Sequence, residues 1–360
     1  MTLAFLDKYN VVDYRTLRAV GMSHAAISSA VDCCLLKLSR GTYSIIRACT
    51  EHKHRPVTKL LSDDDWVDFF RTTTPFSRAA DHRFDEHVAR LKIVHYRHFR
   101  AADAVSGVSA AILHELPLYK AELERIVVSH PSAASRSPEI IRWRRHFSPE
   151  DVCRVHGVRS FTPVRTGLDL IAESGPAGGM AALEGGLRTQ VERESGDSQI
   201  GMRNPQRMHT IGREIVARDF VPAAMRLRQG RERALRILAI ISPLSENYAE
   251  SRTSFALHQM GLHDFTQQWN VGRDGDLLTR LDFLHRPTNT VLAFDGGQKY
   301  ANFGGERLKH EGRLQNELLN MGFRIVHLEI NDVMNLKRFE MKLFAQAPQL
   351  LDYRGKPTLK

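Results

Sequence analysis

In the first fifty residues, apolar side chains recur at helical spacing in two short segments, and turn-forming residues separate these segments. A helix is predicted from Asp13 to Val20, with Asp13 as its N-cap and Gly21 as the residue that ends it. Ser23 is placed to cap a second helix over 24–33, whose apolar stripe consists of Ala26, Ile27, Ala30 and Val31. Two short helices joined by a glycine-containing turn predict a helix-turn-helix.

Residues 35–46 predict a wing, in which two short strands join at Arg40-Gly41 with cations at the tip. A winged helix-turn-helix places its second helix in the major groove, and flanking cations hold phosphates. The residues expected to face the bases are Ser23, His24, Ser28, Ser29 and Asp32, and those expected at the phosphates are Arg15, Arg18, Lys37, Arg40 and Tyr43. A small helical cap that contacts protein is the open alternative.

The middle of the chain mixes helix and strand patterns. Strands are predicted at 124–130, 140–144 and 155–160, helices at 85–97, 108–114, 166–172 and 180–188, and a mobile linker at 192–206. The histidine-rich run at 52–56 is compatible with a metal site, but beside a proline a solvated loop is favoured. We therefore expect an α/β multidomain protein with a winged helix-turn-helix (1–50), an insert and connecting helix (51–105), a middle α+β domain (106–190), an Arg-rich linker and helix (191–240) and a C-terminal α/β domain (241–352).

The C-terminal third predicts a helix at 248–259, strands at 277–283, 290–295 and 323–328, and two further helices at 306–321 and 331–345. Its candidate chemistry consists of Glu250, Asp282 and Asp295, followed by Lys299. Carboxylates at the ends of adjacent strands can hold Mg²⁺, which polarises a phosphodiester and generates hydroxide, while a lysine stabilises developing charge. From spacing alone, structural roles are favoured, with Asp282 capping a strand and Asp295-Gly296 forming a turn.

The composition excludes several classes of protein. With 42% hydrophobic and 26% charged residues, the chain of 360 residues is expected to fold into two or three domains rather than remain disordered. It contains no apolar run near the roughly 20 residues of a membrane helix and no N-terminal secretion signal, so a cytoplasmic protein without a membrane partner is expected. The four cysteines, at 33, 34, 49 and 153, suit neither a disulfide framework nor a paired zinc motif, and reduced thiols are expected.

Arginine dominates the positive charge of the chain. The formal net charge is +10, and only 12 of the 51 Lys and Arg residues are Lys. Between 201 and 236 nine arginines stand against three acids, and a second group consists of Arg142, Arg144, Arg145, Arg154, Arg159 and Arg165. Such groups form phosphate-tracking surfaces or solvated faces, and a GC-rich genome raises arginine content by itself.

Several short motifs resemble those of a known family. They are Leu38–Tyr43, Ser109–His114, Thr162–Asp169, Glu250-Ser251-Arg252, Leu281-Asp282-Phe283, Phe294-Asp295-Gly296, Gln315-Asn316 and Gly322–Val326. The C-terminal motifs resemble the PD-(D/E)XK endonuclease domain of the very-short-patch-repair type, and the whole chain is similar to actinobacterial antitoxins of the AbiEi family. The resemblance implies a restriction-endonuclease-like C-terminal fold, with Asp282 as the central metal ligand and Glu250 as the helix carboxylate. The family has a second carboxylate two positions before the residue that corresponds to Asp295. In this chain that position is Ala293, which implies weaker metal binding.

These patterns lead to one hypothesis and two alternatives. The hypothesis is a regulator that binds double-stranded DNA and represses its own operon, with a nucleotidyltransferase-type toxin as partner and a nuclease-like domain whose site is damaged. The first alternative is an active Mg²⁺-dependent DNA endonuclease, in which Asp282, Glu250, Asp295 and Lys299 carry the catalysis. The second alternative is a protein-interaction module without a DNA function.

Overall fold

The computed structural model describes residues 9–31, 33–79, 81–121, 123–273, 276–294 and 305–359. The chain divides into two compact units: unit 1 contains residues 1–115 and 120–162, and unit 2 contains residues 116–119 and 163–360. Both units combine helices with sheets, so the expected mixed α/β class is confirmed. The division after Thr162 falls inside the range 106–190, which the sequence predicts to be one domain.

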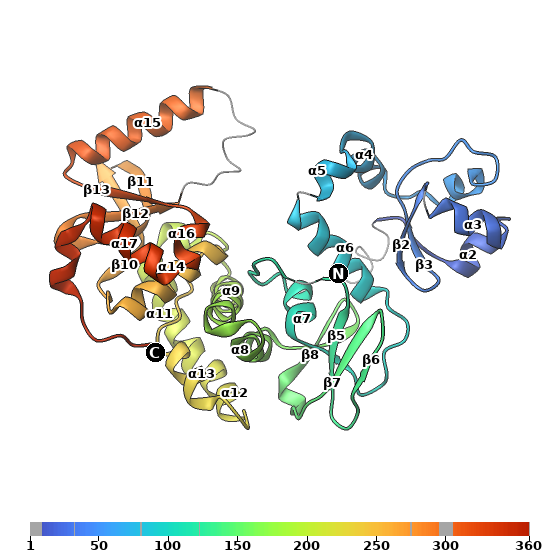
Figure 1. Ribbon diagram of the computed structural model, residues 1–360, viewed down its shortest axis with the longest axis horizontal. Coiled ribbons are helices and arrows are strands. Elements are labelled where there is room, and N and C mark those ends of the chain that lie inside the picture. Colours follow the sequence, from blue (N-terminus) through green and yellow to red (C-terminus); the bar gives the residue numbers. More distant parts are fainter. Residues whose placement is uncertain are drawn as a thin grey trace. The chain divides into compact units, whose positions relative to one another are not determined.

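Unit 1 begins with a small sheet and two short helices (blue, Figure 1). The elements are β1 (Val11–Asp13), α2 (Tyr14–Ala19), α3 (His24–Ala30), β2 (Leu35–Ser39) and β3 (Thr42–Ile45), and the antiparallel sheet has the order β1–β3–β2. As predicted, Asp13 and Ser23 cap the helices, accepting hydrogen bonds from the backbone N–H of Thr16 (2.7 Å) and Ala26 (3.1 Å). The core of this part includes Leu17, Met22, Ile27, Ala30, Leu35 and Ile45.

The polar segment that follows is folded. It forms the 3₁₀ helix η1 (Arg55–Leu60) and the helices α4 (Asp64–Thr72), α5 (Pro75–Ala79) and α6 (His82–Val94). Trp66 is buried, donates from Nε1 to Ser44 Oγ at 2.8 Å and packs against Phe69, Phe70 and Phe84. This tryptophan fastens α4 to β3. The predicted solvated loop at 52–56 is wrong for His54, whose residue is only 1% exposed because its ring lies against Ser29 and Cys49.

The rest of unit 1 is a six-stranded mixed sheet with the order β6–β7–β5–β4–β9–β8. Its strands are β4 (Ala104–Val105), β5 (Ile126–His130), β6 (Ser135–Arg136), β7 (Ile140–Arg144), β8 (Val152–Val155) and β9 (Val158–Phe161), with α7 (Gly107–Leu113) after β4 and the 3₁₀ turn η2 (Pro149–Asp151) before β8. Arg142 is buried and bonds both carboxylate oxygens of Asp103 at 2.7 Å. Its role is therefore structural, and the expectation of a phosphate-tracking surface is wrong for Arg142.

The first part of unit 2 is helical. It consists of α8 (Pro163–Glu173), α9 (Gly175–Ser195), α10 (Ile200–Arg203), α11 (Pro205–Ile215), the π-helical segment η3 (Val216–Phe220), α12 (Val221–Met225) and α13 (Arg231–Leu238). The predicted linker at 192–206 is thus mostly helical. A Cβ on Gly179 would lie 2.4 Å from Ile171 Cγ1, so this glycine permits a close approach of α9 to α8 that outweighs its low helix propensity. Arg165 on α8 is buried with Asp169 (3.1 Å), which removes a second arginine from the expected surface group.

The second part of unit 2 is a four-stranded sheet (orange to red, Figure 1). Its strands are β10 (Phe265–Arg273), β11 (Asp276–His285), β12 (Thr290–Phe294) and β13 (Arg324–Leu328), in that order, and only the β12–β13 pair is parallel. The other elements are α14 (Tyr248–Met260), η4 (Arg286–Thr288), α15 (Gly305–Asn320), α16 (Ile330–Met334), α17 (Leu336–Gln346) and η5 (Pro348–Tyr353). Helices α14 and α17 pack on the face that carries Phe283, Leu292 and Val326. Leu318 of α15 packs against Leu284 and Val291 of the opposite face.

A search of the described helices finds none with the length and apolar character that a bilayer crossing requires.

Candidate functional site

Helix α3 has a buried face and an exposed face. Ala26, Ile27 and Ala30 are buried in the core of unit 1, as the apolar stripe predicts. The residues predicted to read bases, Ser23, His24, Ser28 and Ser29, are exposed, while Asp32 lies outside the described residues. His24 Nδ1 lies 3.4 Å from the hydroxyl of Tyr14. The exposed face therefore presents hydroxyls and an imidazole, which are groups that can exchange hydrogen bonds with base edges.

Four of the side chains predicted to bind phosphates are cations, and all four are exposed. Arg15 and Arg18 lie on α2, Lys37 on β2 and Arg40 in the turn that joins β2 to β3. Within the described part of the chain, none of them forms an ion pair, although Arg18 Nη1 donates to the carbonyl of Met22 at 2.8 Å. Tyr43 is half-buried and pairs with Lys37 across the hairpin. The cationic side chains are accordingly open to an external anion.

The β2–β3 hairpin is also fixed to the rest of unit 1. The backbone N–H of Arg40 donates to the carboxylate of Glu139 at 3.0 Å. A small cavity of about 170 Å³ is lined by Lys37 of the hairpin, by Lys92 of α6, by Tyr96 after this helix, and by Glu139. Because a carboxylate already accepts from this N–H, the groups that the hairpin offers to an added anion are its side chains.

The second basic surface lies on α10 to α13 and the segments between them. All nine arginines between 201 and 236 are exposed: Arg203, Arg207, Arg213, Arg218, Arg226, Arg228, Arg231, Arg233 and Arg236. Local acids neutralise two of them, since Arg203 pairs with Asp197 at 3.2 Å and Arg218 with Glu194 at 2.6 Å. Arg213 donates to the carbonyls of Leu238 and Ala239. The segment is a basic helical surface that is partly neutralised by its own chain.

The predicted helix carboxylate, Glu250, lies in the first turn of α14 and is buried. Its Oε2 accepts hydrogen bonds from the backbone of Glu246 (2.8 Å) and from Gln268 Nε2 (3.1 Å), and its Oε1 accepts from Asn247 Nδ2 (2.6 Å). Burial raises the pKa of Glu250 to about 8, and the negative charge of Asp282 acts in the same direction. The surroundings therefore favour a neutral carboxyl at this position.

The predicted central ligand, Asp282, is half-buried on β11. It immediately precedes Phe283, which pairs with Leu292 of β12, so the next residues along the two strands are Asp282 and Ala293. The paired register of the two strands ends at Phe283 and Leu292, so Asp282 and Ala293 each come one residue beyond the last pair. Ala293 is the position where the resemblance expects a second carboxylate.

His327 lies beside Ala293 on the neighbouring strand. It pairs with Ala293 in parallel register on β13, and its Nε2 lies 3.2 Å from Gln315 Nε2 on α15. Sequence reasoning did not single out His327. The available signal is the alternation of β13, in which Val326 and Leu328 are buried and His327 between them is not.

The described residues do not complete a magnesium site in this region. Mg²⁺ requires near-octahedral oxygen coordination, but both oxygens of Glu250 already accept hydrogen bonds, and the side chain of Ala293 offers no oxygen. The remaining predicted catalytic residues, Asp295 and Lys299, lie outside the described residues. The arrangement of Glu250, Asp282 and Ala293 therefore supports no metal-dependent step by itself.

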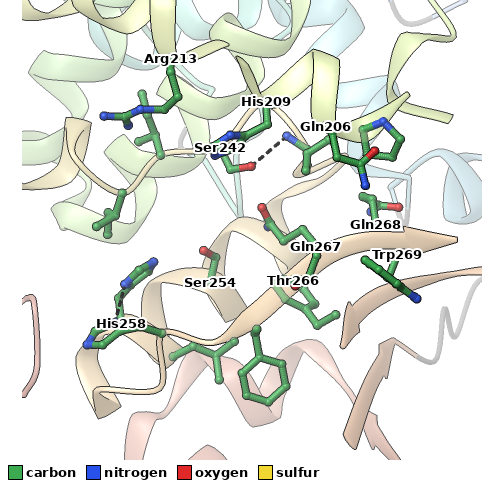
Figure 2. A pocket seen from close by; sticks show the side chains of 18 of the residues that line it. Gln206, His209, Arg213, Ser242, Ser254, His258, Thr266, Gln267, Gln268 and Trp269 are labelled. Carbon is green, nitrogen blue, oxygen red and sulfur yellow. Dashed lines mark hydrogen bonds between the residues drawn. The ribbon is translucent and has the colours of Figure 1, made fainter. Parts of the chain in front are cut away.

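A pocket of about 620 Å³ lies between α11, α14 and β10 (Figure 2). Gln268 belongs both to its lining and to the hydrogen bonds of Glu250. Burial, together with the neighbouring His263 whose Nδ1 lies 3.1 Å from His258 Nδ1, lowers the pKa of His258 to about 4. The described lining contains Arg213 but no carboxylate. The pocket is suited to hydrogen bonding with a polar or anionic molecule and not to the predicted carboxylate chemistry.

Comparisons of the chain with protein-family models, with curated proteins and with solved structures find no match.

Proposed function

We propose that the protein is a DNA-binding regulator in which residues 11–45 act as a winged helix-turn-helix and α3 enters the major groove. The observation that carries this proposal is the exposed polar face of α3 together with four exposed cations that form no ion pair among the described residues. Cations of this kind displace counterions from duplex phosphates, which supplies much of the binding free energy. The hydroxyls of α3 then provide contacts that distinguish bases.

The regulatory role follows from the resemblance to AbiEi-family antitoxins. Binding upstream of its own reading frame represses transcription there, and the C-terminal sheet holds DNA or a toxin of the nucleotidyltransferase type. Two features of unit 2 support contact over cleavage: the arginines exposed between 201 and 236, and the incomplete set of carboxylate ligands around Asp282.

Fluorescence anisotropy with the duplex upstream of the reading frame tests the proposal. Affinity should fall steeply as salt rises, and Arg15→Ala should reduce the slope of log K against log salt by about 1, because one phosphate contact is lost. The matched control is Arg71→Ala, which removes an exposed arginine of α4 that pairs with Asp68 and should leave the slope unchanged. If the folded protein binds no duplex in a salt-dependent way, the regulator is excluded and the protein-interaction module is favoured.

The second candidate is a Mg²⁺-dependent DNA endonuclease of the PD-(D/E)XK type. It is favoured by one observation, namely that Asp282 lies near enough to Glu250 for its charge to raise the pKa of Glu250. This candidate requires nicking of supercoiled plasmid in Mg²⁺ or Mn²⁺ that disappears in Asp282→Ala and persists in Asp352→Ala, which changes an exposed aspartate near the C-terminus. Nicking that survives Asp282→Ala comes from another source.

A further inference from the structure

Four side chains that play no part in the proposed DNA contact meet at the C-terminal end of α3. Cys33 and Cys34 follow this helix, where both backbone N–H groups donate to the carbonyl of Ala30 at 3.0 and 2.8 Å. Cys49 follows β3, and His54 directly precedes η1. We call Cys33, Cys34, Cys49 and His54 the Cys/His cluster. Their three sulfurs and one ring nitrogen all lie within 4.8 Å of one another.

Two separations within the Cys/His cluster match those of a tetrahedral metal site. Zinc bonds of about 2.3 Å to sulfur and about 2.0 Å to nitrogen, at tetrahedral angles, separate two sulfurs by about 3.8 Å and a sulfur from a nitrogen by about 3.5 Å. The observed distances are 3.6 Å between the Sγ atoms of Cys33 and Cys49, and 3.7 Å from Cys49 Sγ to His54 Nδ1. A disulfide requires about 2.05 Å, and all four cysteines of the chain are free. The sulfurs are thus spaced to share a cation.

Solvent exposure identifies the kind of site. Cys34, Cys49 and His54 are 0%, 7% and 1% exposed, and Cys33 is half-buried. Structural zinc sites have four protein ligands and no open position, whereas catalytic sites keep one position for water or substrate. A buried set of three thiols and one imidazole is typical of a structural site.

Neighbouring side chains orient and balance the Cys/His cluster. Ser29 Oγ lies 2.8 Å from His54 Nε2, which leaves Nδ1, the nitrogen next to Cys49, for a metal ion. Arg47 donates from Nη2 to Cys33 Sγ at 2.8 Å, and its charge offsets the excess negative charge of three thiolates around a divalent ion. Glu51 lies 3.3 Å from His54 Nδ1, but its carboxylate is 57% exposed and can turn into solvent when a metal ion takes that nitrogen.

We propose that Cys33, Cys34, Cys49 and His54 bind one Zn²⁺ ion in a closed, structural site. Thiolate and imidazole ligands select zinc over Mg²⁺ and Ca²⁺, which prefer oxygen. The ligands stand before β2 and after β3, so the ion joins the two ends of the hairpin to each other and to α3. Binding free energy at such a site is also folding free energy. The site is independent of the DNA-binding proposal, since no nucleic-acid contact enters the argument.

Metal analysis of the full-length chain, purified without a metal-binding tag and under reducing conditions, tests the proposal. One zinc ion per chain is expected. Cys49→Ser and His54→Ala should lose it, whereas Cys153→Ser should retain it, because Cys153 lies on β8 outside the Cys/His cluster. Loss of zinc from Cys153→Ser to the same extent would contradict the assignment of the ligands.

The wild-type chain provides a second test that does not depend on the folding of variants. After chelation, added Co²⁺ should give the visible absorption of tetrahedral cobalt with thiolate ligands, and Zn²⁺ should abolish it. Removal of the metal should also expose three further cysteines to thiol labelling. The proposal is overturned by a folded, reduced chain that contains no zinc and binds no Co²⁺, by iron in place of zinc, or by a Cys33–Cys49 disulfide as the native state.

Discussion

The two units each gather ionisable side chains in their interior, where burial raises the pKa of the Cys34 thiol as it raises those of the Glu184 and Glu250 carboxyls, but the two units arrange the potential ligand atoms differently. In unit 1 the Cys/His cluster turns three sulfurs and one nitrogen toward a common centre, and the Arg47 guanidinium bonds one of the sulfurs. In unit 2 the buried carboxyls of Glu184 and Glu250 are surrounded by neutral hydrogen-bond donors, and burial raises the pKa of both. The first arrangement suits a bound cation, and the second suits a protonated acid.

This difference shows what decides whether potential ligands can form a metal site. The family resemblance points to Glu250 and Asp282 as metal ligands, yet the oxygens of Glu250 already accept hydrogen bonds from Glu246, Asn247 and Gln268. The Cys/His cluster has no recognised spacing, but its ligand atoms converge. Convergence of the ligand atoms on a common centre is therefore a better criterion than a match to a motif.

Removing the metal should produce the largest effect on stability, and this effect should be confined to unit 1. Zinc at 1,000 times its dissociation constant stabilises a fold by about 4 kcal/mol. Chelation should therefore lower the protection of amides in α3 and η1 against hydrogen exchange by roughly a thousandfold, for those amides that exchange only when this region unfolds. Hydrogen exchange followed by mass spectrometry measures the change, and peptides from α9 in unit 2 serve as the control. Equal loss of protection in both units would contradict a local zinc site.

Replacing Glu184 by Gln should have the next largest effect, in unit 2. Glu184 is buried, and its Oε1 accepts from the backbone of Ser242 at 2.9 Å; burial raises the pKa of Glu184 to about 7, although this hydrogen bond opposes the shift. Between pH 4.5 and 7 the unfolded chain releases this proton while the folded chain keeps it, so the wild type should lose stability as pH rises, by roughly 3 kcal/mol in total. Glu184→Gln should remove that loss, equal the wild type near pH 4 and exceed it at pH 8.

Urea unfolding at a series of pH values measures this effect. Fluorescence of Trp269 reports on unit 2 when Trp66 and Trp143 of unit 1 are replaced by Phe. Glu232→Gln, which changes an exposed glutamate on α13, should reproduce the wild-type curve. If the curve of Glu184→Gln also parallels the wild type, then Glu184 is ionised in the folded chain and the contrast between the two units fails.

The sequence predicts those parts of the fold that depend on local chemistry. The caps at Asp13 and Ser23 form as expected, and strands β11, β12 and β13 lie close to their predicted ranges. Strand β10 was not predicted, because its polar residues lack a regular alternation and Gln268 has a positive φ of 54° that interrupts the pleat. The helical course of 175–195 also depends on a tertiary contact, the approach of α9 to α8 at Gly179.

The candidate sites divide in the same way. The exposed residues of α3 follow from helical periodicity, which needs only neighbours in the sequence. The Cys/His cluster does not follow from periodicity. Cys34 and Cys49 come together only after the hairpin folds, and the turn after α3 directs two adjacent cysteines inward. Adjacent Cys residues followed by a distant Cys and His match no familiar zinc spacing, and the burial of His54 has no local signature.

The smallest predicted effect distinguishes two neighbouring serines on one helix. Ser28 and Ser29 are both exposed residues of α3, but the Ser29 hydroxyl lies 2.8 Å from His54 Nε2. Outer partners of metal-binding histidines contribute 10- to 100-fold to affinity, so Ser29→Ala should weaken zinc binding about tenfold. Ser28→Ala should leave zinc binding unchanged and, where the DNA proposal holds, weaken DNA binding.

Competition against a chromophoric zinc chelator, together with anisotropy on the upstream duplex, measures both quantities for each variant. The two substitutions remove the same hydroxyl group from adjacent positions, so helix propensity and surface loss are matched between them. Equal zinc affinity in Ser28→Ala and Ser29→Ala would mean that Ser29 does not hold the His54 ring. The orientation of Nδ1 toward Cys49 would then have to come from the packing of the ring alone, and the Cys/His cluster would be less well organised for a cation than its distances indicate.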